Sequence, residues 1–184
     1  DMFYRAGGLV AVHPIFPSGF ALSHGAVRSS LMERAQNYIG AVLEHEAPGP
    51  GDTLIVVNAY GINASTIEAV LKGKQLGAKI IAVTSTMASR SIPKEHPARH
   101  PSEKNLCDLK EVDVIISFEG FDVKVSPVST ILNSFVLQAL VGYASERLLA
   151  EGIKPPIWRS TNLPGGDEHN KKYVEAYSTR VKNL

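Results

Sequence analysis

The residues best suited to chemistry form one short segment, the loop 58–66, which reads Asn58-Ala59-Tyr60-Gly61-Ile62-Asn63-Ala64-Ser65-Thr66. Gly61 permits close approach of the backbone to a ligand, and Asn63 tolerates a left-handed turn. Ser65 and Thr66 place hydroxyl groups at the start of the helix that we expect to follow. Backbone N–H groups and the helix dipole favour an anion there, so the segment predicts a phosphate site. The alternative is a well-capped strand-to-helix turn without a ligand, because Ser, Thr and Asn cap many helices.

Two other groupings lie in the long polar segment 85–102. His96 and His100 have the spacing of a metal-binding pair on a helix, but Pro97 and Pro101 argue against a helix there. We therefore interpret both histidines as parts of a solvated loop and predict no metal site. The same segment carries three cations that either clamp a phosphate or are simply solvated: Arg90, Lys94 and Arg99.

Four apolar runs predict the buried strands that position the loop 58–66. They cover residues 9–12, 54–57, 79–84 and 112–117, and they show no alternation of polar and apolar residues. Such runs are typical of strands whose two faces are both covered. Because the strands alternate with helical segments, we expect an α/β fold, a three-layer sandwich with a doubly wound parallel sheet. Ligands of these sheets bind beyond the carboxyl ends of the strands, which is where the loop begins.

The spacing of apolar residues predicts the helices between these strands. One continuous helix is expected from residue 27 to about residue 45, and the last turns of another over residues 1–6. Ser65 and Glu68 have the form of a capping box at the start of a further helix, which ends at Gly77. A short helix is expected near residues 104–109.

Two more helices are expected in the last third of the chain. Ser126-Pro127 predicts the start of a helix that runs to about residue 149. This helix carries an unexpected polar row, formed by Thr130, Asn133, Ser134 and Gln138. A polar row on a mostly buried helix is hydrogen-bonded, lines a cavity or forms a subunit contact. Asp167 is expected to cap a last helix in which Tyr173 and Tyr177 lie one turn apart.

Composition narrows the class of protein. A chain of 184 residues suits a single domain, in which residues 155–184 are expected to be a C-terminal extension that packs on the rest. The net charge of +1 excludes the basic surface that non-specific nucleic-acid binding requires. No apolar run approaches the roughly 20 residues that span a bilayer, so we expect a cytoplasmic protein. Cys107 is the single cysteine, which excludes an internal disulfide and predicts a buried thiol.

The loop 58–66, followed by Lys79-Ile80-Ile81-Ala82-Val83-Thr84-Ser85, resembles the phosphosugar-binding core of the SIS (sugar isomerase) domain family. Further stretches narrow the resemblance to bacterial SIS-domain proteins that carry the label phosphoheptose isomerase. These stretches are Phe3-Tyr4-Arg5-Ala6-Gly7-Gly8-Leu9, His100-Pro101-Ser102, Ser126-Pro127-Val128-Ser129-Thr130-Ile131 and Leu163-Pro164-Gly165-Gly166-Asp167-Glu168. The resemblance covers nearly the whole chain.

The resemblance implies a five-stranded parallel sheet that binds a sugar phosphate at two loops. One family loop has a Ser-x-Ser-Gly pattern that falls on Asn58, Tyr60 and Gly61, so neither serine is kept. Asn58 and Tyr60 still offer hydrogen-bond donors. The other loop, rich in glycine, and the first strand are expected to precede residue 1. The contacts to the phosphosugar that the resemblance implies come from Asn58, Tyr60, Gly61, Asn63, Ser65, Thr66, Thr84, Ser85 and Thr130.

The resemblance further implies a phosphosugar-binding protein whose leading enzymatic form is an aldose–ketose sugar-phosphate isomerase. Such an isomerase needs a base near the phosphate loop, and the candidates are Asp1, Glu33 and Glu119. The glutamine and histidine of the family's later helix fall on Thr130 and Gln138, neither of which is a general acid–base at neutral pH.

Two alternatives from other classes remain open. The first is a non-catalytic phosphosugar sensor, and the second is a lyase or deaminase that acts on an amino-sugar phosphate. We expect no cofactor and no metal. The expected partners are a sugar phosphate and further copies of the chain in a homodimer or homotetramer, without nucleic acid or membrane.

Overall fold

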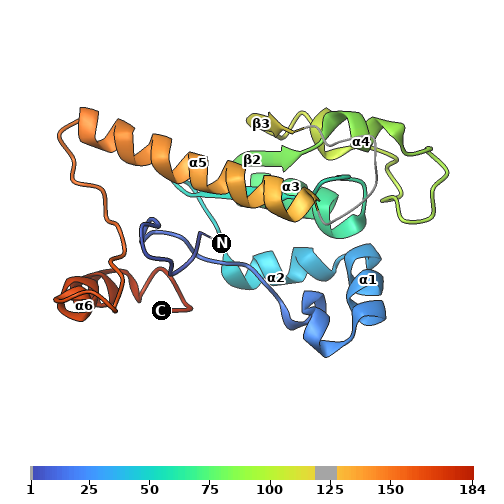
Figure 1. The fold of residues 1–184 in the computed structure, drawn as a ribbon. Coiled ribbons are helices and arrows are strands. Elements are labelled where there is room, and N and C mark those ends of the chain that lie inside the picture. The colour runs from blue at the N-terminus through green and yellow to red at the C-terminus, as the bar shows by residue number, and fades with distance from the viewer. Residues whose placement is uncertain (1, 119–127) are drawn as a thin grey trace. The chain divides into compact units, whose positions relative to one another are not determined.

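The computed structural model describes residues 2–118 and 128–184 (Figure 1). The chain forms two compact units, one of them Phe16–Ser129 and the other Asp1–Ile15 together with Thr130–Leu184. Both units are built from helices and loops, and Phe16–Ser129 also holds the sheet.

The unit Phe16–Ser129 is built on a parallel sheet of three strands in the order β1-β2-β3. The strands are β1 (Thr53–Val57), β2 (Lys79–Thr84) and β3 (Val114–Ser117). Ala82 of β2 pairs with Val56 of β1 on one side and with Ile115 of β3 on the other. This sheet confirms the predicted α/β class, and the three strands lie within two residues of their predicted bounds.

Helix α3 (Ala64–Gln75) connects β1 to β2 and packs against both strands (Figure 1). Its apolar side chains Ile67 and Val70 are fully buried. The residue that precedes the helix is Asn63, and Ser65 is already the second helical residue. The predicted capping box was therefore wrong, because the carboxylate of Glu68 accepts its hydrogen bond from the N–H of Asn37 instead.

The predicted continuous helix from residue 27 to 45 was also wrong, since two helices occupy this segment. Helix α1 spans Ala26–Arg34 and helix α2 spans Tyr38–Glu46. Ala35 is extended and Asn37 adopts a left-handed conformation with φ of 64°. Asparagine reaches this conformation at lower cost than most residues, so the chain turns there without a glycine. Before α1, two short 3₁₀ helices cover Ser18–Phe20 and Leu22–His24.

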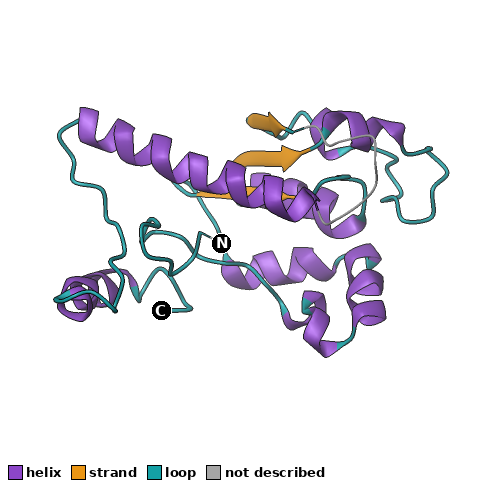
Figure 2. Cartoon of the chain, viewed as in Figure 1, coloured by secondary structure: helices purple, strands orange, loops and turns teal. Residues whose placement is uncertain are grey.

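The connection from β2 to β3 is mostly loop, but it begins with helix α4 (Thr86–Ser91) (Figure 2). The hydroxyl of Ser85 caps α4 by accepting the N–H of Ala88 at 3.1 Å. The expectation of an entirely irregular segment 85–102 was thus wrong at its start. The short helix expected near residues 104–109 is a single 3₁₀ turn over Leu106–Asp108.

In the other unit, two expected elements at the beginning of the chain are missing. Residues 2–6 form turns in place of the expected helix, and residues 9–12 form no strand. Leu9 makes one isolated antiparallel bridge with Ile157, and Val10 is fully buried. Bridging to a later segment of the chain has replaced the predicted place in a parallel sheet.

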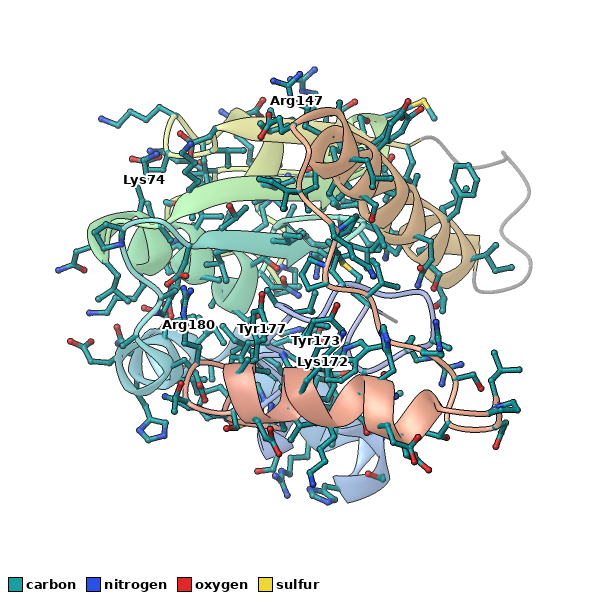
Figure 3. All side chains as sticks on the ribbon, turned by 90° about the vertical axis from the view of Figure 1, so that its left-hand side faces the viewer. Lys74, Arg147, Lys172, Tyr173, Tyr177 and Arg180 are labelled. Atoms are coloured by element: carbon teal, nitrogen blue, oxygen red, sulfur yellow. The ribbon has the colours of Figure 1, made fainter. Side chains whose placement is uncertain are left out.

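Two helices complete this unit. Helix α5 (Val128–Ala150) confirms the long predicted helix, although its predicted cap, Ser126-Pro127, lies outside the described residues. Helix α6 spans Gly166–Tyr177, and its N-cap is Gly165 in place of Asp167, which lies in the first turn. Tyr173 and Tyr177 project from the same side of α6 with ring centroids 6.5 Å apart (Figure 3).

Candidate functional site

The loop 58–66 leaves β1 in a turn that is closed by the side chain of Asn58. The Asn58 Oδ1 atom accepts the N–H groups of Tyr60 at 3.1 Å and of Gly61 at 2.7 Å. The N–H of Asn58 donates to the carbonyl of Val83, so this residue still pairs with β2. A short side-chain acceptor thus sets the course of the loop as it leaves the sheet.

Gly61 is the tightest point of the loop. Its φ is +57°, and a Cβ atom at this position would lie 2.6 Å from the Cβ of Leu106. The carbonyl of Gly61 accepts the N–H of Leu106 at 2.7 Å, which holds the two backbones together. Glycine is therefore required here by close packing as well as by conformation.

The last residue of β2 and the residue after it hold the backbone of the loop. The hydroxyl of Thr84 is fully buried and donates to the carbonyl of Ala59 at 3.1 Å. The N–H of Ser85 donates to the same carbonyl at 3.0 Å. Thr84 and Ser85, which the sequence resemblance places among the ligand contacts, are thus brought to the loop and hold its backbone.

The loop ends at the N-terminus of α3. The carbonyl of Asn63 accepts the N–H groups of Thr66 and Ile67, each at 3.1 Å. The N–H groups of Ala64 and Ser65 precede these two, and they have no acceptor among residues 2–118 and 128–184. Unpaired N–H groups at the start of a helix carry its positive end and are suited to an anion.

Helix α1 adds a carboxylate to this end of α3. The amide nitrogen of Asn63 donates to Glu33 Oε2 at 3.3 Å, and Asn63 Oδ1 accepts the hydroxyl of Thr66 at 2.7 Å. Of the three predicted candidates for a base, Glu33 is therefore at the loop. Asp1 and Glu119 lie outside the described residues.

The other predicted ligand contacts differ in exposure and in the unit to which they belong. Tyr60 is half-exposed at the tip of the loop, while Ser65 is buried in the first turn of α3. Thr130 belongs to the unit that contains α5, where it lies in the first turn of that helix. The structure thus gathers Asn58, Tyr60, Gly61, Asn63, Ser65, Thr66, Thr84 and Ser85 in one unit.

Two of the three cations of the segment 85–102 form hydrogen bonds with other groups of the protein. Arg90 pairs with Asp108 at 2.9 Å, and hydrogen bonds from Asn105 and from Arg90 lower the pKa of the Asp108 carboxyl. The guanidinium of Arg99 donates to four acceptors within the same loop, the carbonyls of residues 92, 93 and 103 and the side chain of Asn105. Both arginines therefore have partners within the protein, and the alternative of a phosphate clamp stays a prediction for them. Lys94 is exposed.

The sequence pattern does not predict one pair of ionisable side chains that the structure brings together, Glu68 and His100. The Nε2 atom of His100 lies 3.8 Å from Glu68 Oε1, and the two side chains are only 16% and 14% exposed. The interpretation of His100 as a solvated residue was wrong, because its side chain is largely buried. Its backbone N–H donates to the carbonyl of Ile62 at 2.7 Å. No local spacing joins residues 68 and 100, so the pattern of the sequence holds no signal for this pair.

The described part of the chain contains neither a metal centre nor an exposed thiol. Residues 2–118 and 128–184 contain no group of three His, Cys, Asp or Glu side chains that would hold a metal ion. Cys107 is a free and buried thiol, as predicted, and burial raises its pKa. Among the same residues, no helix combines the length and the apolar character that crossing a bilayer requires.

Comparison with known proteins agrees with this geometry. Residues 1–85, which include the loop 58–66, match the model of the SIS domain. The whole chain aligns with the UPF0309 protein of Geobacillus kaustophilus at 37% identity, covering 75% of that protein. It also aligns over its full length with the UPF0309 proteins of Halalkalibacterium halodurans and Caldanaerobacter subterraneus. The identities are 35% and 33%, and the alignments cover 76% and 78% of those proteins. These relatives align over the full chain, and the match to the SIS model includes the junction of β1 and α3. The chain therefore belongs to the UPF0309 family of SIS-domain proteins.

Proposed function

We propose that this chain binds a sugar phosphate at the loop 58–66, with the phosphate on the N-terminus of α3. The observation that carries the proposal is the pair of N–H groups, on Ala64 and Ser65, for which the described residues hold no acceptor. They follow a loop whose shape is fixed by Asn58 and Gly61. Two N–H donors together with the helix dipole provide a positive site that needs no serine pair.

A proline at position 64 tests this proposal directly. Ala64 is the first residue of α3, where proline is tolerated, and Asn63 before it already has the extended conformation that a following proline requires. Ala64→Pro removes one of the two N–H donors. Because Ala64 is buried, urea unfolding of the variant must first show that its unfolding midpoint is retained. Ser65→Ala is the matched control, since it removes a hydroxyl and keeps the N–H group.

The assay is isothermal titration with hexose, heptose and amino-sugar phosphates. We expect Ala64→Pro to weaken binding by about tenfold, because a hydrogen bond to a charged group is lost, and Ser65→Ala to retain most of the affinity. If none of these sugar phosphates binds to the wild-type chain, or if a folded Ala64→Pro variant binds as tightly as wild type, the phosphate is not held by α3.

The finer proposal is that the chain is an aldose–ketose sugar-phosphate isomerase. In that reaction a base removes the proton from C2 of the aldose and the proton returns to C1, while another proton moves from O2 to O1. Glu33 is the carboxylate best placed to act, because Asn63 holds it at the start of α3. Exchange of the C2 proton with heavy water would reveal the reaction, and Glu33→Gln should remove that exchange without preventing binding.

The exchange experiment and an analysis of the products together separate the alternatives. A non-catalytic sensor would bind the sugar phosphate without any exchange at C2. A lyase or deaminase would release a carbonyl product or ammonia from an amino-sugar phosphate. The isomerase is favoured over both only by the position of Glu33, so exchange that persists in Glu33→Gln would remove this residue as the base.

We also propose that the chain assembles into a homodimer or homotetramer through α5. Ile131, Phe135 and Leu149 of this helix are each more than 60% exposed. At about 100° per residue they lie within roughly 40° of one another around the helix axis, which forms an apolar stripe. Light scattering should give a multiple of the chain mass, and Phe135→Glu should shift it toward the single chain.

A further inference from the structure

A second polar feature lies within the unit Phe16–Ser129, and no residue of the loop 58–66 belongs to its lining. It is a depression of about 570 Å³ between α2 and α3. We call it the α2–α3 depression and define it by six of its lining residues, Gln36, Asn37, Glu44, Glu68, Lys72 and His100. Its volume lies within the range of ordinary small-molecule sites.

Glu68 is fixed at the wall of this depression. One carboxylate oxygen, Oε2, accepts the N–H of Asn37 at 2.7 Å. Asn37 is the N-cap of α2, so the carboxylate also lies at the positive end of that helix. The other oxygen, Oε1, is directed toward His100 at 3.8 Å. This distance is too long for a direct hydrogen bond.

His100 is fixed in a single tautomer. Its Nδ1 atom accepts the N–H of Ser102 at 3.2 Å and lies 2.8 Å from the hydroxyl of the same residue. Since Nδ1 is an acceptor, the neutral imidazole carries its hydrogen on Nε2. The depression therefore presents an acceptor, Glu68 Oε1, next to a donor, His100 Nε2–H.

The spacing of this acceptor and donor matches a hydroxyl group. An oxygen atom about 2.8 Å from both atoms would see them about 85° apart, an angle at which one hydroxyl can donate and accept. An ammonium group has no lone pair to accept from Nε2–H. A phosphate carries negative charge at neutral pH, and the carboxylate of Glu68 would repel it.

The rest of the lining supports a neutral ligand as well. The ammonium of Lys72 forms an ion pair with Glu44, so it is not available as a free cation. Gln36 and Gln75, which also line the depression, offer amide donors and acceptors. We propose that the α2–α3 depression is a second binding site, which takes a neutral polyhydroxylated molecule by placing one hydroxyl between Glu68 and His100.

This site would be linked to the loop 58–66 through the chain itself. The N–H of His100 donates to the carbonyl of Ile62, one residue after Gly61. A ligand that moves the imidazole therefore acts on a residue whose backbone is bonded to the loop. The proposal does not depend on phosphate binding at α3, and Ala64→Pro should leave it intact.

The test is a titration followed by two-dimensional NMR of the ¹⁵N-labelled chain. The probes are D-glucose, D-fructose, N-acetyl-D-glucosamine and sorbitol, with ethanolamine and inorganic phosphate as probes of the wrong chemistry. We expect at least one neutral probe to shift the amide signals of Asn37 and His100 in a saturable manner. Ethanolamine should shift neither signal, and phosphate should not shift that of Asn37.

Two variants and one control make the test specific. Glu68→Gln keeps a carbonyl for the N–H of Asn37 but turns a second donor toward His100, so binding should weaken at least tenfold. Ala41→Trp fills the depression from its exposed rim, without changing Glu68 or His100, and should abolish the shifts. Glu95→Gln, on the exposed loop outside the depression, makes the same charge change and should titrate as wild type.

The proposal is overturned if none of the four neutral probes shifts Asn37 and His100. It is equally overturned if Glu68→Gln or Ala41→Trp titrates like the wild-type chain, or if ethanolamine produces the larger shifts. Loss of sugar-phosphate binding in Ala64→Pro with an unchanged response to the neutral probe would show that the two sites are separate.

Discussion

Replacement of Gly61 by alanine is the most direct test of how the loop 58–66 is built. The added Cβ would lie 2.6 Å from the Cβ of Leu106 and 3.2 Å from the hydroxyl of Thr84. Carbon atoms in contact are normally about 3.5–4.0 Å apart, so Leu106 would have to retreat by roughly 1 Å. Leu106 is fully buried, and its N–H is bonded to the carbonyl of Gly61. The loop therefore cannot relax on one side alone.

The expected destabilisation follows from three contributions. Overpacking of a buried contact costs about 1–3 kcal/mol, and a left-handed alanine costs about 1–2 kcal/mol more than a glycine. Alanine also lowers the entropy of the unfolded chain, which stabilises the folded state by about 0.4–1 kcal/mol. The free energy of unfolding should thus fall by about 1–5 kcal/mol, a large fraction of the roughly 5–15 kcal/mol that holds a typical domain folded.

Urea unfolding of the wild-type chain and two variants measures this effect. Gly51→Ala is the matched control in the same unit, because Gly51 has a φ of +91° and a Cβ added there would have no atom within 4 Å. The control includes the conformational cost without the contact, and it should lose about 1 kcal/mol. If Gly61→Ala is no less stable than Gly51→Ala, the contact with Leu106 does not constrain the loop and the reasoning fails.

Three further predictions concern the surroundings of this loop. Asn58→Ala removes the acceptor of two N–H groups and should lower the free energy of unfolding by about 1–2 kcal/mol. Asn58→Asp keeps the acceptor, so the urea midpoint should be retained. The added negative charge should weaken phosphosugar binding. Hydrogen bonds from Lys74 and from the N–H of Ile80 lower the pKa of the Asp113 carboxyl. The stabilisation by the Asp113 carboxylate is therefore present at neutral pH and is lost as the pH falls through that lowered pKa. The melting temperatures of Asp113→Asn and wild type should differ more at pH 7 than at pH 3. Arg99→Lys loses the planar fork that binds four acceptors, and hydrogen exchange across residues 92–105 should become faster, while an unchanged exchange rate would show that the guanidinium contacts do not order the loop.

The strands of the sheet are predictable because their signal is local. Consecutive β-branched residues between polar turns define β1, β2 and β3 without reference to the rest of the chain. The same local signal fails at residues 9–12, where pairing with a segment around Ile157 decides the structure. An apolar run shows that a segment is buried, as Val10 is, but it does not name the partner.

The break between α1 and α2 shows the same limit for helices. Apolar residues continue at helical spacing across Ala35, so the pattern predicts one helix. The turn at Asn37 is stabilised by a carboxylate 31 residues away, that of Glu68, which accepts the Asn37 N–H. A hydrogen bond between distant residues leaves no trace in a local pattern.

The candidate site divides along the same line. Asn58, Gly61 and the start of α3 are recognisable because turn residues and helix starts have local signatures. The approach of Glu33 to Asn63 and the pairing of Glu68 with His100 depend on how α1, α2 and the segment 85–102 fold back on α3. The part of the site that acts through tertiary contacts therefore required the structure.

The sequential order of the three strands has a consequence for how the protein acquires its structure. Thr53 pairs with Lys79, a separation of 79 − 53 = 26 residues, and Ile81 pairs with Val114, a separation of 114 − 81 = 33 residues. Contacts between nearby parts of a chain close small loops and form quickly. Strand β2 takes part in both pairings, and its Ile80, Ala82, Val83 and Thr84 are fully shielded from solvent. The backbone N–H groups of β2 should consequently be the last in this unit to exchange with solvent. Slow exchange there would identify β2 as the segment on which the loop 58–66 is assembled.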